Sequence, residues 1–320
     1  MNILITGGLG FMGFHLSKYL FENFPDSRIQ IVDNLSSTKT DYHLLDHSIE
    51  IEITDLKSFN PDRSYDRIYH LASPVGSLGI ISKTGRIALD ILELAEKVLK
   101  LALNDNGRLL YISSSEIYGQ DGSHSELDNQ MVPVQHGPRM EYALGKLTAE
   151  HMFINHCKKE KIDLRIVRPF NVMGQYQSAD LGFVIPRFFE AALQGNELTV
   201  YGDGRQKRSF CHVSDIVSAV SLIMENGEAF EIYNVGNDNN VTDINALAIQ
   251  IIELTGSNSE IRKVDPKELH GETYLEAFEK IPDISKIRSL NWTPKVDLRS
   301  ALVQYLHSLK GPQSIDMNYV

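Results

Sequence analysis

The sequence predicts an α/β protein with a doubly wound parallel sheet and a smaller C-terminal substrate-binding domain. The first observation is a short apolar run at residues 3–5, followed by glycines at positions 7, 10 and 13 and then by a helical pattern. The second is an alternation of apolar runs with helical segments through the first half of the chain. A strand, a glycine turn and a helix N-terminus in this order suit a pyrophosphate, so we expect a Rossmann domain that binds a dinucleotide.

The remaining elements of this first part follow from the alternation. Apolar runs of strand length predict strands at residues 29–33, 49–53, 67–71, 108–113 and 164–168. Helical patterns between them predict helices at 86–103 and 142–158. Ligands bind at the carboxyl ends of the strands in such a sheet, so the residues just after each run are the candidates for a site.

Beyond Pro169 the alternation loosens. We expect a helix at 185–194, a strand at 230–235 that returns to the sheet, and a helix at 247–254. The predicted domains are 1–170 with 211–235, which binds the dinucleotide, and 171–210 with 236–310, which binds the substrate. The residues after these, 311–320, are expected to form a frayed tail.

Composition narrows the class of protein. With 320 residues and 42% apolar content the chain can bury a full core, and its net charge of −11 argues against nucleic acid as a partner. Two cysteines, Cys157 and Cys211, have no metal-ligand spacing and suggest a reducing compartment. Because no apolar run has the length of a bilayer and Met1 leads directly into a strand, we expect a cytoplasmic protein without a membrane partner or a metal.

An acidic residue predicts which dinucleotide binds. Asp33 ends the strand at 29–33, twenty residues after Gly13, where a carboxylate can bind ribose hydroxyls. No arginine follows it, since Asn34 and Leu35 come next, so a 2′-phosphate would have no counter-charge. The expected cofactor is therefore NAD rather than NADP.

A tyrosine and a lysine supply the candidate chemistry. Tyr142 and Lys146 lie four residues apart, on one face of the predicted helix. A lysine ammonium near the phenol would lower the tyrosine pKa toward neutrality and make it a usable general base. The alternative is an ordinary surface pair, but the position after the Ser113-Ser-Ser-Glu116 strand end favours a site.

Several motifs occur together in one order along the chain. They are residues 6–13, Asp33-Asn34-Leu35, His70-Leu71-Ala72-Ser73-Pro74, Gly137-Pro138-Arg139, Tyr142 with Lys146, Arg168-Pro-Phe-Asn171 and the segment 208–215. In these motifs the chain resembles the extended short-chain dehydrogenase/reductases that act on nucleotide sugars, and UDP-glucuronate decarboxylases (UDP-xylose synthases) most of all. The resemblance runs from Met1 to about residue 305.

The resemblance implies a set of site residues. The implied NAD contacts are Gly7, Gly10, Phe11, Met12, Gly13, Asp33, Asn34, Asp55, Leu56, Leu71, Ala72, Ser73, Ser113, Tyr142, Lys146 and Val172. The implied catalytic residues are Tyr142, Lys146, Ser114, Ser115, Glu116 and Arg208. The implied substrate contacts are Asn171, Val184, Tyr201, Arg208 and Lys280, the last at a position that binds the nucleotide phosphates in the family.

The resemblance also implies a reaction. Oxidation at C4 of a UDP-hexuronate places a ketone β to the carboxylate, which is then lost as CO₂, and Arg208 would stabilise the enolate. Departures from the decarboxylase pattern at Ile91, Gln175, Phe183 and Lys280 leave the sugar and the nucleotide base open. Whether the 4-keto product is reduced or released is open too.

Two other classes of function therefore remain. One is a 4-epimerase, a 4,6-dehydratase or a C4 dehydrogenase on the same scaffold, and the other is a non-catalytic NAD-binding regulator. Apolar residues on more than one face of the helices at 86–103 and 142–158, together with the pairing of these helices in the family, predict a homodimer.

Overall fold

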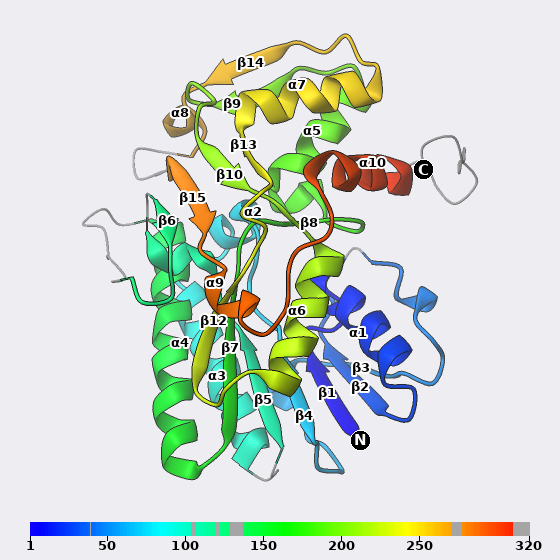
Figure 1. The fold of residues 1–320 in the computed structure, drawn as a ribbon, viewed down its shortest axis with the longest axis vertical. Coiled ribbons are helices and arrows are strands. Elements are labelled where there is room, and N and C mark those ends of the chain that lie inside the picture. The colour runs from blue at the N-terminus through cyan, green and yellow to red at the C-terminus, as the bar shows by residue number, and fades with distance from the viewer. Residues whose placement is uncertain (39, 104–106, 120–121, 129–136, 271–276, 310–320) are drawn as a thin grey trace.

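The computed structural model describes residues 1–38, 40–103, 107–119, 122–128, 137–270 and 277–309 (Figure 1). The expected tail at 311–320 lies outside these residues. A sheet of seven parallel strands forms the centre of the first part, in the order β12-β7-β5-β4-β1-β2-β3. Its strands are β1 (Asn2–Thr6), β2 (Arg28–Asp33), β3 (Glu50–Ile53), β4 (Arg67–His70), β5 (Arg108–Ile112), β7 (Asp163–Pro169) and β12 (Glu231–Val235).

Helices cover both faces of this sheet, which explains why its inner strands are almost continuously apolar. On one face α1 (Phe11–Asn23) packs against α6 (Val213–Asn226). On the other, α3 (Ile87–Leu103) packs against α4 (Pro138–Glu160) (Figure 1). Each face has its own buried hydrophobic cluster, so the sheet is the common wall of two cores.

A smaller part lies above the end of the sheet in Figure 1 and has a third buried cluster. Its main elements are α5 (Val184–Leu193), β9 (Leu198–Tyr201), β10 (Lys207–Ser209), β13 (Val241–Asp243), α7 (Ile244–Thr255), β14 (Ile261–Val264), α8 (Pro266–His270), β15 (Glu279–Pro282) and α10 (Leu298–Leu309). A short strand from the first part, β6 (Ser123–His124), pairs with β15 and completes a sheet in the order β13-β10-β15-β6.

Shorter elements complete the structure. They are α2 (Ser77–Ile81), β8 (Val172–Met173), β11 (Cys211–His212), α9 (Ser285–Arg288), and four 3-10 turns at Tyr42–Leu44, Leu56–Ser58, Ser115–Tyr118 and Ala179–Leu181. Strand β8 pairs with β11, which brings the chain back to α6 and the central sheet. In the described residues no helix is long and apolar enough to cross a membrane.

The strands and helices expected from the sequence are present, with ends that differ by a few residues. The late strand expected at 230–235 is confirmed as β12, at the edge of the sheet beside β7. The helix expected from Tyr142 begins earlier, at Pro138, because proline suits a first helical position and Gly137 precedes it as the cap. Tyr142 therefore lies in the second turn of α4.

Candidate active site

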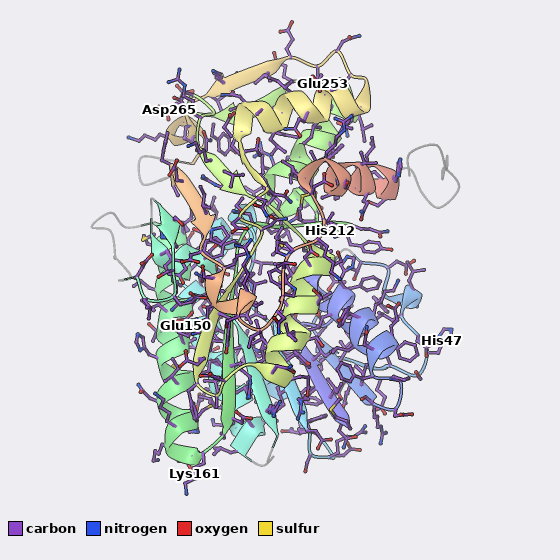
Figure 2. The ribbon with its side chains drawn as sticks, in the orientation of Figure 1. His47, Glu150, Lys161, His212, Glu253 and Asp265 are labelled. Atoms are coloured by element: carbon purple, nitrogen blue, oxygen red, sulfur yellow. The ribbon has the colours of Figure 1, made fainter. Side chains whose placement is uncertain are left out.

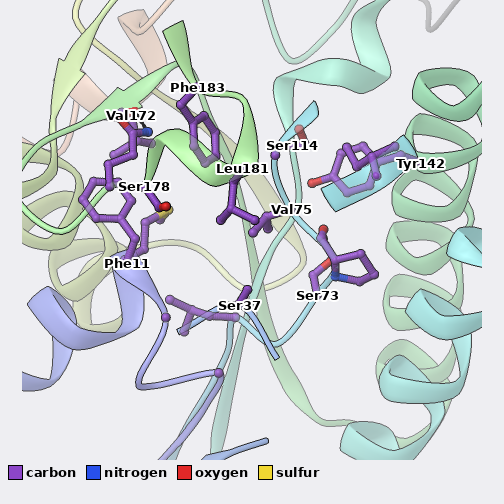
Figure 3. A pocket seen from close by; sticks show the side chains of 18 of the residues that line it. Phe11, Ser37, Ser73, Val75, Ser114, Tyr142, Val172, Ser178, Leu181 and Phe183 are labelled. Atoms are coloured by element: carbon purple, nitrogen blue, oxygen red, sulfur yellow. Dashed lines mark hydrogen bonds between the residues drawn. The ribbon is translucent and has the colours of Figure 1, made fainter. Parts of the chain in front are cut away.

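A single cavity of about 590 Å³ collects nearly all of the predicted site residues. It lies where β1, β2, β4 and β5 end, and residues of α5, β9 and β10 complete its wall. Figure 3 shows side chains from both parts pointing into it, among them Phe11, Tyr142 and Phe183.

The predicted residues in the wall come from every group named from the sequence. The expected NAD contacts there are Gly7, Gly10, Phe11, Met12, Gly13, Asp33, Asn34, Asp55, Leu56, Leu71, Ala72, Ser73, Ser113, Tyr142, Lys146 and Val172. The expected catalytic and substrate residues there are Ser114, Ser115, Glu116, Asn171, Val184, Tyr201 and Arg208. Lys280 is the exception, because it does not line the cavity.

The glycine turn has the shape that an anion needs. Gly7 has a φ of +70°, and a Cβ there would lie 2.7 Å from the backbone of Ala72. A Cβ on Gly13 would lie 2.2 Å from the Gly7 carbonyl oxygen. Gly10 caps α1 without a side-chain hydrogen bond, so the N–H groups of the first helical turn remain available to a phosphate at this end of the cavity.

The acid at the end of β2 is held in place by the glycine turn itself. The Asp33 carboxylate accepts hydrogen bonds from the backbone N–H groups of Leu9 (3.0 Å) and Leu35 (2.8 Å). It lines the cavity, where a ribose could hydrogen-bond to it. Ser113 offers a further polar group, since its buried hydroxyl has no hydrogen-bond partner among the described residues. An orphaned buried hydroxyl in the wall of a cavity fits a bound ligand such as NAD.

Tyr142 and Lys146 are both buried, with 6% and 2% of their surface exposed. The Lys146 ammonium donates to the Ile112 carbonyl oxygen at 2.9 Å and lies 5.9 Å from the centre of the Tyr142 ring. Burial raises the pKa of Tyr142 above its ordinary value, although a hydrogen bond with Ser114 lowers it. Burial likewise lowers the pKa of Lys146 to about 7.

The expectation that the lysine lowers the pKa of the tyrosine is therefore wrong. The Tyr142 and Lys146 side chains are both buried away from water. The Lys146 ammonium is hydrogen-bonded to a main-chain carbonyl of β5 rather than to the phenol. Desolvation disfavours the charged form of each group, and it is the largest cause of the pKa shift of both.

Glu116 lies among positive charges. Its carboxylate accepts from Lys280 at 2.6 Å and is 3.4 Å from the Arg139 guanidinium. Burial alone would raise the pKa of Glu116, but Arg139, Lys280 and Arg208 together hold it well below its usual range. Glu116 is therefore a carboxylate at neutral pH and does not carry a proton to donate.

Arg208 is positioned by the main chain of the smaller part. It is buried, and its guanidinium donates to the carbonyl oxygens of Lys207 and Ala277, both at 2.7 Å. Strands β10 and β15 pair so that Arg208 lies directly beside Lys280. A permanent cation therefore stands in the cavity wall beside Glu116.

The remaining predicted substrate residues lie along the same wall. Asn171 has a φ of +28°, and its side-chain amide donates to the Ser209 carbonyl oxygen at 2.9 Å. The Tyr201 hydroxyl accepts from Arg187 at 3.2 Å, with the guanidinium carbon 5.3 Å from the ring centre.

The cavity residues that were not among the predicted site residues include two arginines, Arg139 and Arg187. Arg139 precedes Tyr142 by three residues on α4, and Arg187 follows Val184 by three on α5. A spacing of three places side chains on one helix face, so this signal could have identified both. In the described residues no group of histidine, cysteine or carboxylate side chains could hold a metal ion.

The glycine turn, Asp33 and the Tyr142–Lys146 pair in one cavity define a dinucleotide-binding enzyme of the Rossmann class. Comparison with known proteins agrees, since residues 3–236 match the NAD dependent epimerase/dehydratase family. The chain belongs to this family and is an NAD-dependent enzyme.

Two relatives and one solved structure illustrate the likeness. The chain is 32% identical over 294 residues to the UDP-N-acetyl-alpha-D-glucosaminuronate decarboxylase of Bacillus cytotoxicus, with 90% of each chain covered. It is 33% identical over 325 residues to UDP-glucuronic acid decarboxylase 3 of Arabidopsis thaliana, covering 94% of this chain and 87% of that one. The structure of the UDP-N-acetylglucosamine 4-epimerase of Methanobrevibacter ruminantium M1 matches with a TM-score of 0.83 at 26% identity, covering 97% of this chain and 98% of that one.

Proposed function

We propose that the protein oxidises C4 of a nucleotide sugar and decarboxylates a UDP-uronate, with UDP-glucuronate giving UDP-xylose or its 4-keto form. The observation that carries the proposal is one cavity in which the Tyr142–Ser114 pair, the Glu116 carboxylate and the buried Arg208 cation stand together beyond the glycine turn. The names of two relatives support it, because both are decarboxylases of UDP-linked uronic acids.

Each side chain has a role in this reaction. Bound NAD supplies reversible hydride transfer at C4, and the residues of the glycine turn with Asp33 hold it. Tyr142 takes the proton of the C4 hydroxyl, with Ser114 as its hydrogen-bond partner. Lys146 lies one helical turn away and would hold the nicotinamide ribose. Burial raises the pKa of Tyr142, so the hydrogen bond with Ser114 is the contact that favours its base form.

Arg208 acts on the acid itself. Loss of CO₂ from a 4-keto uronate leaves negative charge on an enolate oxygen, and a buried, main-chain-held guanidinium stabilises that charge without reorganising. Ser115 and Asn171 lie in the same wall and are proposed to contact the sugar, and Val184 and Tyr201 the nucleotide.

The product identifies the reaction. Purified protein is incubated with UDP-, GDP-, dTDP- and CDP-linked sugars, and the masses of the products are measured by mass spectrometry. We expect loss of CO₂ from a UDP-uronate. Loss of water instead, or no reaction with any uronate, would overturn the proposal.

Arg208→Ala tests the carboxylate chemistry within that reaction. Lost oxyanion stabilisation slows a reaction about a hundred- to a thousandfold, so CO₂ release should slow by that factor. The rate at which NADH absorbance first appears should be almost unchanged. A single-turnover experiment follows both signals together. Equal slowing of both at saturating substrate would remove Arg208 from the decarboxylation step.

A second candidate is a 4-epimerase, favoured by the structural likeness to the Methanobrevibacter ruminantium enzyme. It would use the same tyrosine and the same cofactor and would return hydride to the other face of the sugar. The product would then have the mass of the substrate.

We also infer a homodimer, a cytoplasmic location and the division into domains at 1–170 with 211–235 and 171–210 with 236–310. Support for the dimer comes from exposed leucines on the paired helices, Leu89 on α3 and Leu144 on α4. The third buried cluster, confined to the smaller part, supports the division.

A further inference from the structure

Lys280 makes a contact that binding to nucleotide phosphates does not explain. Only 2% of its side chain is exposed, and its ammonium donates to Glu116 Oε1 at 2.6 Å. It is not one of the residues that line the cavity. The phosphate contact expected from the sequence stays a prediction, while the contact that the structure shows is with Glu116.

The strand register explains why an opposite charge beside Lys280 is favourable. Arg208 on β10 and Lys280 on β15 are partners in parallel pairing, and both are buried. Like charges on neighbouring strands repel each other, and a buried charge without an opposite charge is costly. Glu116 supplies the opposite charge, from the turn that follows β5 on the far side of the interface between the two parts.

The charged and titratable groups that face Glu116 come from three elements. They are Arg139 and Tyr142 on α4, Arg208 on β10 and Lys280 on β15. The Glu116 charge in turn raises the pKa of Tyr142. A change in the protonation of Glu116 would therefore change the pKa of Tyr142, the proposed base.

We propose that Lys280 is a positioning residue for Glu116, which it holds ionised and in one place beside Tyr142. Glu116 then enters the reaction as a hydrogen-bond acceptor at the sugar end of the cavity and not as an acid. Only this last consequence rests on the proposed function. The effect of Lys280 on Glu116 itself does not require any particular substrate.

The test measures the protonation of Glu116 directly. The NAD-loaded protein is labelled with ¹³C at the glutamate carboxyl carbon and titrated by NMR, and Glu116→Gln identifies the resonance. An opposite charge this close lowers a carboxyl pKa by about 1–3 units, so Lys280→Met should raise the titration midpoint by that amount. Lys280→Arg, which keeps the charge, should restore a low midpoint.

A matched control is available on the same pair of strands. Lys207 pairs with Glu279 across β10 and β15 and is largely exposed, so Lys207→Met removes one positive charge without touching Glu116. It should leave the Glu116 midpoint unchanged. If Lys280→Met does not yield folded protein, the neutral donor Lys280→Gln takes its place and should shift the midpoint in the same direction.

Binding of UDP to the NAD-loaded protein separates the alternatives. If Lys280 binds phosphate, Lys280→Met should weaken UDP tenfold or more by calorimetry and leave the Glu116 midpoint where it was, which would overturn the proposal. An unchanged midpoint with lowered thermal stability would also overturn it, because the role would be structural alone. Neither the Glu116 midpoint nor UDP binding requires turnover. A protein that releases no CO₂ would therefore refute the proposed function, while the effect of Lys280 on Glu116 could still be measured.

Discussion

Tyr142 illustrates how a single residue can be correctly placed by its sequence neighbours and yet have an unexpected protonation state. Its spacing to Lys146 predicts a base, and the structure puts both in the cavity wall. Burial then determines the charge of each group, with a raised pKa for the phenol and a pKa of about 7 for the lysine.

A prediction at this scale concerns the phenol alone. Tyr142→Phe keeps the ring and its packing but removes the proton acceptor, so oxidation at C4 should slow by about a hundred- to ten-thousandfold while NAD still binds. Stopped-flow absorbance of NADH measures the rate of C4 oxidation, and calorimetry with NAD measures whether the cofactor still binds. Tyr19→Phe, on α1 and away from the cavity, is the control and should behave as the wild type. Wild-type NADH formation in Tyr142→Phe would show that another group is the base.

At the scale of elements, α4 orients several functional side chains at once. Arg139, Tyr142, Lys146 and Glu150 recur at intervals of three and four residues and so share one face of the helix. Glu150, labelled in Figure 2, anchors this face to β7 by accepting two hydrogen bonds from the buried Arg168, at 2.9 and 2.6 Å. The same guanidinium donates to the Tyr118 hydroxyl at 2.7 Å, which ties in the turn that carries Glu116.

Glu150→Gln should therefore weaken the whole arrangement. Both members of the pair are 2% exposed, and breaking a buried pair by removing one partner costs about 3–5 kcal/mol. Denaturant unfolding measures the change. The exposed pair of Lys159 and Glu160 at the end of the same helix provides the control, since Glu160→Gln should change stability by less than about 1 kcal/mol. Equal effects of the two variants would mean that the Arg168 pair does not hold α4.

The whole molecule is proposed to pair through α3 and α4. Of the apolar residues on these helices, Ile91 and Phe153 are buried in the core, whereas Leu89 is 46% and Leu144 39% exposed. The helices approach each other closely at Gly145, where a Cβ would lie 2.9 Å from the backbone of Ala88. Leu89 and Leu144 each follow or precede in the chain a residue of this close approach.

Leu89→Glu should convert a dimer to a monomer, because it places a charge in the centre of an isologous apolar contact. Light scattering at micromolar concentration measures the change. Leu193→Glu on α5 alters an equally exposed leucine of the smaller part and should leave the dimer intact. A wild-type monomer at the same concentration would contradict the proposed assembly.

Acid stability is a second property of the molecule as a whole. His70, the last residue of β4, is buried, shares a 2.7 Å hydrogen bond with Thr6, and has a pKa lowered by burial from 6.5 to about 3. Between these values the unfolded chain binds a proton that the folded protein does not, so stability falls as the pH is lowered. His70 alone should remove about 2 kcal/mol between about pH 6.5 and pH 5.

Denaturant unfolding across that pH range checks this expectation. His70→Asn keeps a polar partner for Thr6 but does not titrate, so its stability should fall less steeply with pH than that of the wild type. The exposed His47, labelled in Figure 2, supplies the control variant His47→Asn, which should follow the wild-type slope. Parallel slopes for all three proteins would count against His70 as the acid-sensitive group.

The sequence by itself determined the local parts of this protein. The glycine turn, the strand ends and the Tyr142–Lys146 spacing are short-range patterns, and each depends on a few consecutive residues whose geometry the backbone dictates. Because parallel strands end at one edge of the sheet, those patterns were enough to predict that their residues meet in one cavity.

Only the tertiary structure determined the electrostatics of that cavity. Lys280 and Glu116 are 164 residues apart, and their contact depends on the pairing of β15 with β10 and β6, which no local pattern reports. The protonation of Tyr142, Lys146 and Glu116 depends on how much water the folded chain removes from each group and on which charges it brings near. Desolvation and long-range charge are properties of the packed molecule, so residue types and spacings alone did not predict them.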